Sequence, residues 1–113
     1  MRLFRLLYLT LILMLWLTEG LALDDAHFSA IKHLGQINGV ALHCKALAET
    51  QRIKRALVLN LPKRRQLGDL FDAETNASFL RFIEESGTCP NPDLLRKQVD
   101  EAILQLEATF NRQ

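Results

Sequence analysis

The side chains with the greatest capacity for chemistry lie in one stretch that holds all three histidines and one of the two cysteines. His27, His33 and His43 are six and ten residues apart, whereas two metal ligands on one helix face need a spacing of four. His43 precedes Cys44, but a cysteine committed to a disulfide cannot act as a nucleophile. The sequence contains no C-x-x-C pair, glycine-rich phosphate loop or G-x-S-x-G turn. We therefore expect a non-enzymatic protein without catalytic residues, metal or cofactor.

The two cysteines, Cys44 and Cys89, are the second feature with a chemical role. In an exported chain a single pair of cysteines is expected to form a disulfide, although two unpaired thiols are the alternative. Closing a loop of about 46 residues stabilises a fold by about 4 kcal/mol in the chain-entropy model. Pro90 and Pro92 stiffen the turn that carries Cys89. We expect this bridge to clamp two helices.

Export is expected because residues 1–22 have the three parts of a secretory signal peptide. Arg2 and Arg5 form a basic start, an uncharged run covers residues 6–18, and small residues precede a cut after Ala22. The alternative is a retained membrane anchor, but a span needs about 20 apolar residues and Glu19 ends this run earlier. The mature chain, residues 23–113, is then a single periplasmic or secreted domain with no stable membrane span.

Charge is distributed unevenly along the mature chain, whose formal net charge is zero, so bulk attraction to nucleic acid or to anionic lipid is not expected. Residues 23–65 carry eight basic and three acidic side chains, and residues 66–113 carry four and nine. If Pro62 opens a helix, three cations fall in its first turn, where the helix dipole disfavours them. Such conflicts mark functional sites, so we hypothesise a patch that binds an anion or docks an envelope or secreted protein: Arg52, Arg55, Lys63, Arg64 and Arg65. A solvated loop is the alternative.

Helical periodicity predicts the elements that position these residues. The first segment is capped by Asp24 or Asp25 and has an apolar stripe that includes Cys44 and continues to Ala48. Gly35 and Gly39 lie four apart in it, which predicts either a close helix crossing or a break at Asn38-Gly39. A second helix is expected over residues 49–60.

The third helix is expected from Pro62 to about Glu85, with Gly87 as its stop signal. Its apolar face is interrupted by the polar stretch "ETNAS", residues 74–78, which is also an N-glycosylation pattern at Asn76. Its expected core residues are Leu67, Leu70, Phe71, Phe79, Phe82 and Ile83.

The fourth helix has Asn91 as its N-cap and Pro92 at its first position. The stripe expected to bury this helix consists of Leu95, Val99, Ala102, Ile103, Leu106 and Phe110. Since no alternating β-branched run is present, we predict an all-α fold, a small four-helix bundle with one disulfide, preceded by the cleavable signal peptide.

In layout the sequence resembles the small periplasmic acid-stress chaperones, which are exported helical chains with one long-span disulfide. More loosely it resembles secretion-system pilotins. The resemblance covers the outline and assigns no residue a role. It leaves two functional hypotheses, an interaction or accessory module that docks through the basic patch, and a conditional chaperone that exposes its apolar stripes under acid stress.

Overall fold

The computed structural model describes residues 2–8 and 23–111, and no strand occurs among them. Residues 23–111 contain four long helices, α2 (Asp25–His43), α3 (Leu47–Asn60), α4 (Arg65–Glu84) and α5 (Pro92–Phe110). The predicted all-helical class is therefore confirmed. Residues 2–8, inside the expected signal peptide, form a further helix, so the described residues contain five helices.

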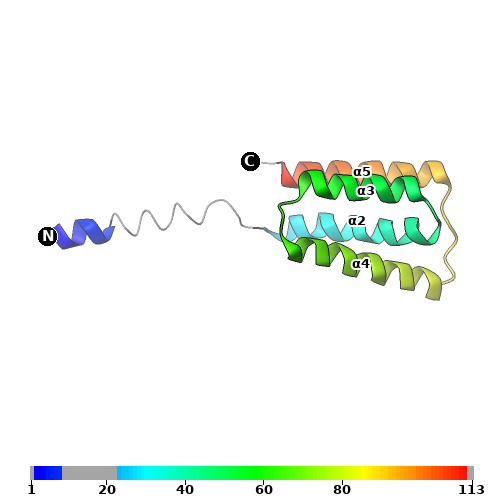
Figure 1. The fold of residues 1–113 in the computed structure, drawn as a ribbon, viewed down its shortest axis with the longest axis horizontal. Coiled ribbons are helices and arrows are strands. Elements are labelled where there is room, and N and C mark those ends of the chain that lie inside the picture. Colours follow the sequence, from blue (N-terminus) through cyan, green and yellow to red (C-terminus); the bar gives the residue numbers. More distant parts are fainter. Residues whose placement is uncertain (1, 9–22, 112–113) are drawn as a thin grey trace.

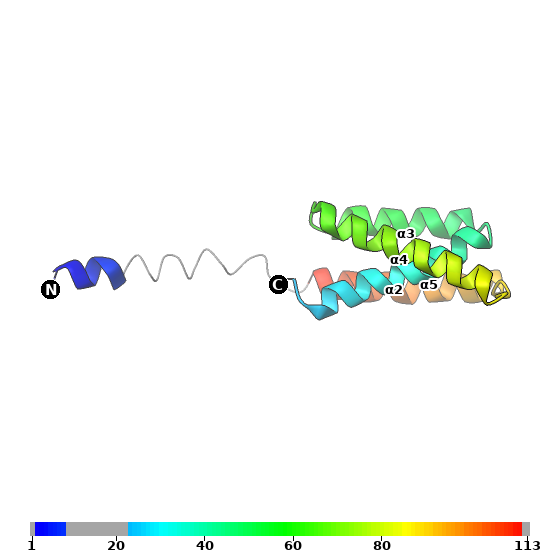
Figure 2. The same ribbon diagram turned by 90° about the horizontal axis from the view of Figure 1, so that it is seen from below.

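Helix α2 is the central element, as Figures 1 and 2 show. It packs against α3, α4 and α5, and α3 also packs against α5. No Cα atom of α4 lies within 8 Å of one in α3 or α5. Among the described helices, α4 is thus attached to the rest of the bundle through α2, although Leu67 and Phe71 reach the common core.

The helix starts follow the predicted capping signals. Asp24 accepts a hydrogen bond from the backbone N–H of His27, whose ring in turn accepts one from the backbone N–H of Asp24, so the two residues form a capping box. The hydrogen bond from the His27 amide lowers the pKa of the Asp24 carboxyl. Asn91 caps α5, with Pro92 as its first residue. Both predicted caps are confirmed.

The helix ends differ from the prediction at two places. Lys45 and Ser86, with φ of 59° and 50°, take the left-handed conformation that ends α2 and α4. The backbone N–H of Ala46 bonds to the carbonyl of Ala41, and that of Gly87 bonds to Phe82, as in a Schellman motif. The apolar stripe of α2, which was expected to continue to Ala48, therefore ends at Cys44. At the end of α4, the residue with positive φ is Ser86 and not Gly87, which was the expected stop signal.

The predicted close crossing at Gly35 and Gly39 is confirmed, and α2 is continuous through Asn38. A Cβ atom on Gly39 would lie 2.6 Å from Cβ of Ser78, and one on Gly35 would lie 2.7 Å from Cβ of Glu74. The two helix backbones approach each other closely because these positions have no side chain.

Polar side chains fill the space around the crossing. Ser78 Oγ donates a hydrogen bond of 2.6 Å to the backbone carbonyl of Gln36. Asn38, which is 2% exposed, donates through Nδ2 to Oγ1 of Thr75 at 3.3 Å. The stretch that interrupts the apolar face of α4 is therefore its contact with α2.

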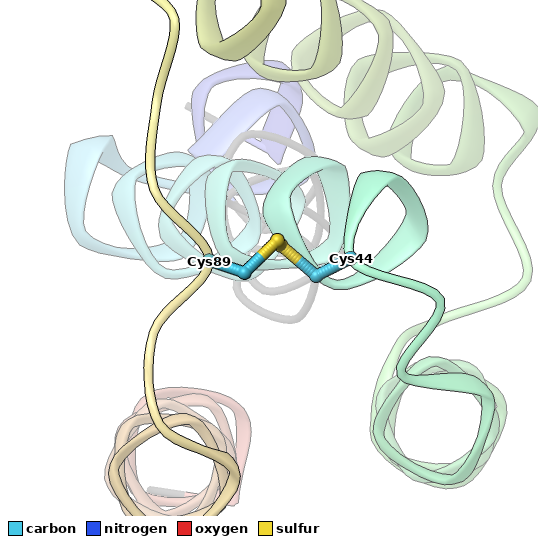
Figure 3. Close-up of a disulfide and its surroundings, with 2 residues drawn as sticks. All are labelled: Cys44 and Cys89. Carbon is cyan, nitrogen blue, oxygen red and sulfur yellow. A yellow bond between two sulfur atoms is a disulfide. The ribbon is translucent and has the colours of Figure 1, made fainter.

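The disulfide links the end of α2 to the connection between α4 and α5 (Figure 3). Cys44 is the C-cap of α2, and Cys89 lies three residues before α5 begins. Their Cα atoms are 5.7 Å apart, within the normal range for a bridge. The expected pairing is present. The bridge joins the two ends of the segment that contains α3 and α4.

Candidate interaction surface

Arg52 is the one member of the predicted basic patch that is engaged in ion pairs within the described part of the chain. It contacts Glu49 in its own helix at 2.6 Å and also Asp100 on α5. The hydrogen bond with Asp100 raises the pKa of the Arg52 guanidinium further. Arg52 therefore joins α3 to α5.

The other predicted cations follow a different local structure from the expected one. Helix α4 begins at Arg65, with Arg64 as an N-cap that makes no side-chain capping bond. The backbone N–H of Arg64 donates to the carbonyl of Pro62 at 2.8 Å, which closes a tight turn before the helix. The expectation that Pro62 opens the helix is wrong, and Arg65 alone of the three cations lies in its first turn.

Lys63 and Arg65 are exposed, and Arg64 is half-buried. Arg55 is exposed on α3, five residues before the end of that helix, which corresponds to about 7.5 Å along its axis. None of these four side chains forms an ion pair with another described residue. The structure thus places Arg55 on the side of α3, Lys63 and Arg64 in the chain that leaves its end, and Arg65 at the start of α4.

The side of α3 that carries Arg55 also exposes apolar side chains that sequence reasoning missed. Leu47, Val58 and Leu59 are 68%, 78% and 75% exposed, the highest values for large apolar residues within residues 23–111. Their helical positions place them on the side opposite the buried Ile53 and Ala56. Leu47 lies at the start of α3 and Val58 and Leu59 near its end, and the polar residues Gln51 and Arg55 lie between them on the same side. We call residues Leu47, Ala48, Gln51, Lys54, Arg55, Val58 and Leu59 the α3 outer face.

The charge of the α3 outer face has one sign. Lys54 and Arg55 are exposed on it, while Glu49, the acidic residue of α3, is turned toward Arg52 with its side chain 13% exposed. Lys63 continues the positive charge past the end of the helix. An apolar surface bordered by cations is suited to a partner that offers both apolar groups and negative charge.

The other surfaces offer less for chemistry. No group of three His, Cys, Asp or Glu in the described ranges could hold a metal ion. His43 lies against the rings of Phe79 and Phe82, with ring centroids 5.5 and 5.0 Å away. A groove over α2, between α4 and α5, has a mixed lining of polar, charged and apolar side chains: Asp25, Phe28, Ser29, Lys32, His33, Gln36, Gln66, Leu70 and Gln105. Among these described residues no hydrogen bond joins the Ser29 hydroxyl to the His33 ring or to the Asp25 carboxylate.

Comparison with known proteins assigns no family. No family model, curated protein or solved structure matches the chain. None of the helices that the structure describes is long and apolar enough to cross a membrane.

Proposed function

We propose that the protein is a small, exported, non-enzymatic interaction module that docks an anionic partner through the α3 outer face. The observation that carries the proposal is the exposure of Leu47, Val58 and Leu59 on one side of a helix whose exposed charges are all positive. Single exposed apolar residues are common, but an exposed apolar patch rimmed by polar residues marks an interaction site, and Val58 and Leu59 lie together beside Lys54 and Arg55. Lys63, Arg64 and Arg65 extend the surface at its end.

Export through cleavage after Ala22 is part of the proposal, and two features of the chain support it. The cut would leave Leu23 as the first residue and keep the capping pair of Asp24 and His27 complete. The disulfide between Cys44 and Cys89 fits an oxidising compartment, such as a periplasm or the exterior of the cell.

Neutralising three cations should test the docking surface. We expect Lys54→Gln/Arg55→Gln/Lys63→Gln to weaken retention on immobilised polyglutamate, on phosphatidylglycerol vesicles or on both by about tenfold or more, because each cation near an anionic surface contributes about 1 kcal/mol. Lys32→Gln/Arg81→Gln/Lys97→Gln removes the same charge from exposed positions elsewhere and is the matched control. Equal retention of both variants on both probes would refute the docking role of the α3 outer face.

A conditional chaperone is the second candidate, and the attachment of α4 favours it. Helix α4 contacts the bundle through α2, at a crossing formed by small and polar residues. At this crossing, Oδ1 of the buried Asn38 has no hydrogen-bond partner among the described residues. Such an unpaired buried atom costs about 1–3 kcal/mol. Separation of α4 would expose Leu67 and Phe71.

Acidification should release α4 if the chaperone hypothesis is correct. At about pH 3 protonation of the carboxylates leaves a strongly positive chain, which favours an expanded state with exposed apolar surface. We expect increased binding of a hydrophobic dye and suppressed aggregation of an unrelated client protein, both measured against the same chain at neutral pH. An unchanged dye signal would remove this candidate.

A further inference from the structure

We infer that the partner of the α3 outer face is an anionic lipid surface, an inference that rests on the docking role proposed above. The exposed set on α3 has the composition of a helix that lies in a membrane interface, with aliphatic side chains beside lysine and arginine. Lysine and arginine can keep their charged ends at the headgroups while their stems cover apolar surface. Phosphatidylglycerol or another acidic phospholipid would offer this surface both negative headgroups and apolar chains.

The positions of the charges explain how a domain with zero net charge could bind such a surface. Lys54, Arg55 and Lys63 are exposed on α3 and in the chain after it, whereas the exposed carboxylates of α4, Asp69 and Asp72, belong to a helix that is not packed against α3. Arg52 pairs with both Glu49 and Asp100, so these three groups together carry one negative charge between α3 and α5. Helix α5, which packs against α3, also exposes Glu101, so the positive charge is confined to the α3 outer face and acts within a Debye length, about 10 Å.

The shape and size of the surface favour a bilayer over a folded protein. Helix α3 lies along one edge of the bundle, as Figure 2 shows, and the α3 outer face belongs to this single helix. A stable protein interface buries about 800 Å² on each partner, which a few side chains on one helix do not provide. A fluid headgroup layer needs no matching cavity, because it deforms around Val58 and Leu59.

The acidic start of α2 determines how the domain would lie. The start of α2 and the ends of α3 and α5 are at one end of the bundle, as contacts of His27 with Phe110 and of Asn60 with Asn111 show. Asp24 and Asp25 are exposed there. Contact through that end would place these carboxylates, beside Lys63, Arg64 and Arg65, against anionic headgroups, whereas the exposed charges on the side of α3 are cations alone, so the domain would lie on the side of α3.

A tryptophan reporter can test this contact directly. The single tryptophan of the chain, Trp16, lies outside the described residues and would be replaced in a Trp16→Phe background. Val58→Trp then places a reporter on the α3 outer face, and Leu104→Trp is the matched control, since Leu104 is 63% exposed on α5. Emission would be recorded with phosphatidylglycerol vesicles and with phosphatidylcholine vesicles.

We expect the emission of the Val58→Trp variant to shift to the blue with phosphatidylglycerol vesicles and to change little with phosphatidylcholine. The emission of the Leu104→Trp variant should not shift with either. High salt and the Lys54→Gln/Arg55→Gln/Lys63→Gln background should each abolish the shift. As a second measurement, Val58→Ser/Leu59→Ser should reduce salt-sensitive flotation with phosphatidylglycerol vesicles about tenfold. This comparison with the parent chain also holds if residues 1–22 are retained.

Each of the following results would overturn the lipid assignment. The α3 reporter could keep its emission with phosphatidylglycerol, or the α3 and α5 reporters could shift equally. A shift of the α3 reporter that grows with protein concentration without vesicles would instead show contact between copies of the chain. If the α3 cations govern retention on polyglutamate and not on vesicles, the docking role stands and its partner is an acidic polypeptide. If they govern neither, both proposals fail.

Discussion

Replacing Gly39 by alanine is expected to destabilise the domain by about 1–2 kcal/mol. The new Cβ atom would lie 2.6 Å from Cβ of Ser78 and 2.7 Å from the backbone nitrogen of Phe79. Overpacking of this kind costs about 1–3 kcal/mol, and α4 must move because one of the opposing atoms is backbone. The gain of about 1 kcal/mol in helix propensity offsets part of this cost. The displacement would also stretch the hydrogen bond from Ser78 to Gln36.

Gly68 provides the matched control for Gly39→Ala. It also lies within a helix, but no atom lies within 4 Å of the position that its Cβ would occupy. Gly68→Ala should therefore stabilise the domain by about 1 kcal/mol through helix propensity alone. Urea unfolding followed by circular dichroism measures both changes. Effects of the same sign at the two positions would contradict the tight α2–α4 crossing.

The elements that could be predicted from the sequence are those whose stability comes from local patterns. The α5 stripe is the clearest case, since Leu95, Val99, Ala102 and Leu106 are buried as their spacing indicates. The caps at Asp24 and Asn91 were also predictable, because a cap depends on residues within one helical turn. Period and capping chemistry act over short distances, so one sequence contains all the information they need.

The packing of α4 could not be predicted in the same way. The apolar periodicity of α4 predicts that Ile83 is buried, but Ile83 is 48% exposed. The same periodicity does not predict the burial of Thr75 and Ser78, which are buried. The reason is that α4 contacts α2 where glycines allow two backbones to approach, so small polar residues fit there better than large apolar ones. Gly35 and Gly39 signal a crossing, but they do not identify the opposing helix.

The basic patch shows the same limit at the candidate site. The charges of Arg55 and Lys63 are evident in the sequence, but the ion pair between Arg52 and Asp100 joins residues 48 positions apart. The exposure of Val58 and Leu59 depends on which side of α3 meets α2 and α5. A helix with apolar residues on two sides does not reveal from its own sequence which side is buried.

Removal of the disulfide is expected to lower the free energy of unfolding by about 4 kcal/mol. The bridge closes a loop across a sequence separation of 45 residues, which contains α3 and α4. Without it the unfolded chain gains conformational entropy, and the connection between α4 and α5 loses its attachment to the end of α2. A domain of this size has a stability of about 5–10 kcal/mol, so the loss would be a large fraction of the total.

Cys44→Ala/Cys89→Ala and the reduced parent chain should show the same urea midpoint, well below that of the oxidised chain. The double variant removes both sulfurs and leaves no thiol to re-form a bond, so a reducing agent should not change its midpoint. The helical signal of the variant without urea should remain close to that of the parent, because α2 and α5 keep their caps and buried stripes. If reduction left the midpoint of the parent chain unchanged, or if both cysteines of the purified protein reacted with an alkylating agent, the clamp between α2 and the start of α5 would not exist. The inference of an oxidising compartment would then lose its chemical basis, because the covalent bond is the feature that ties this fold to such an environment.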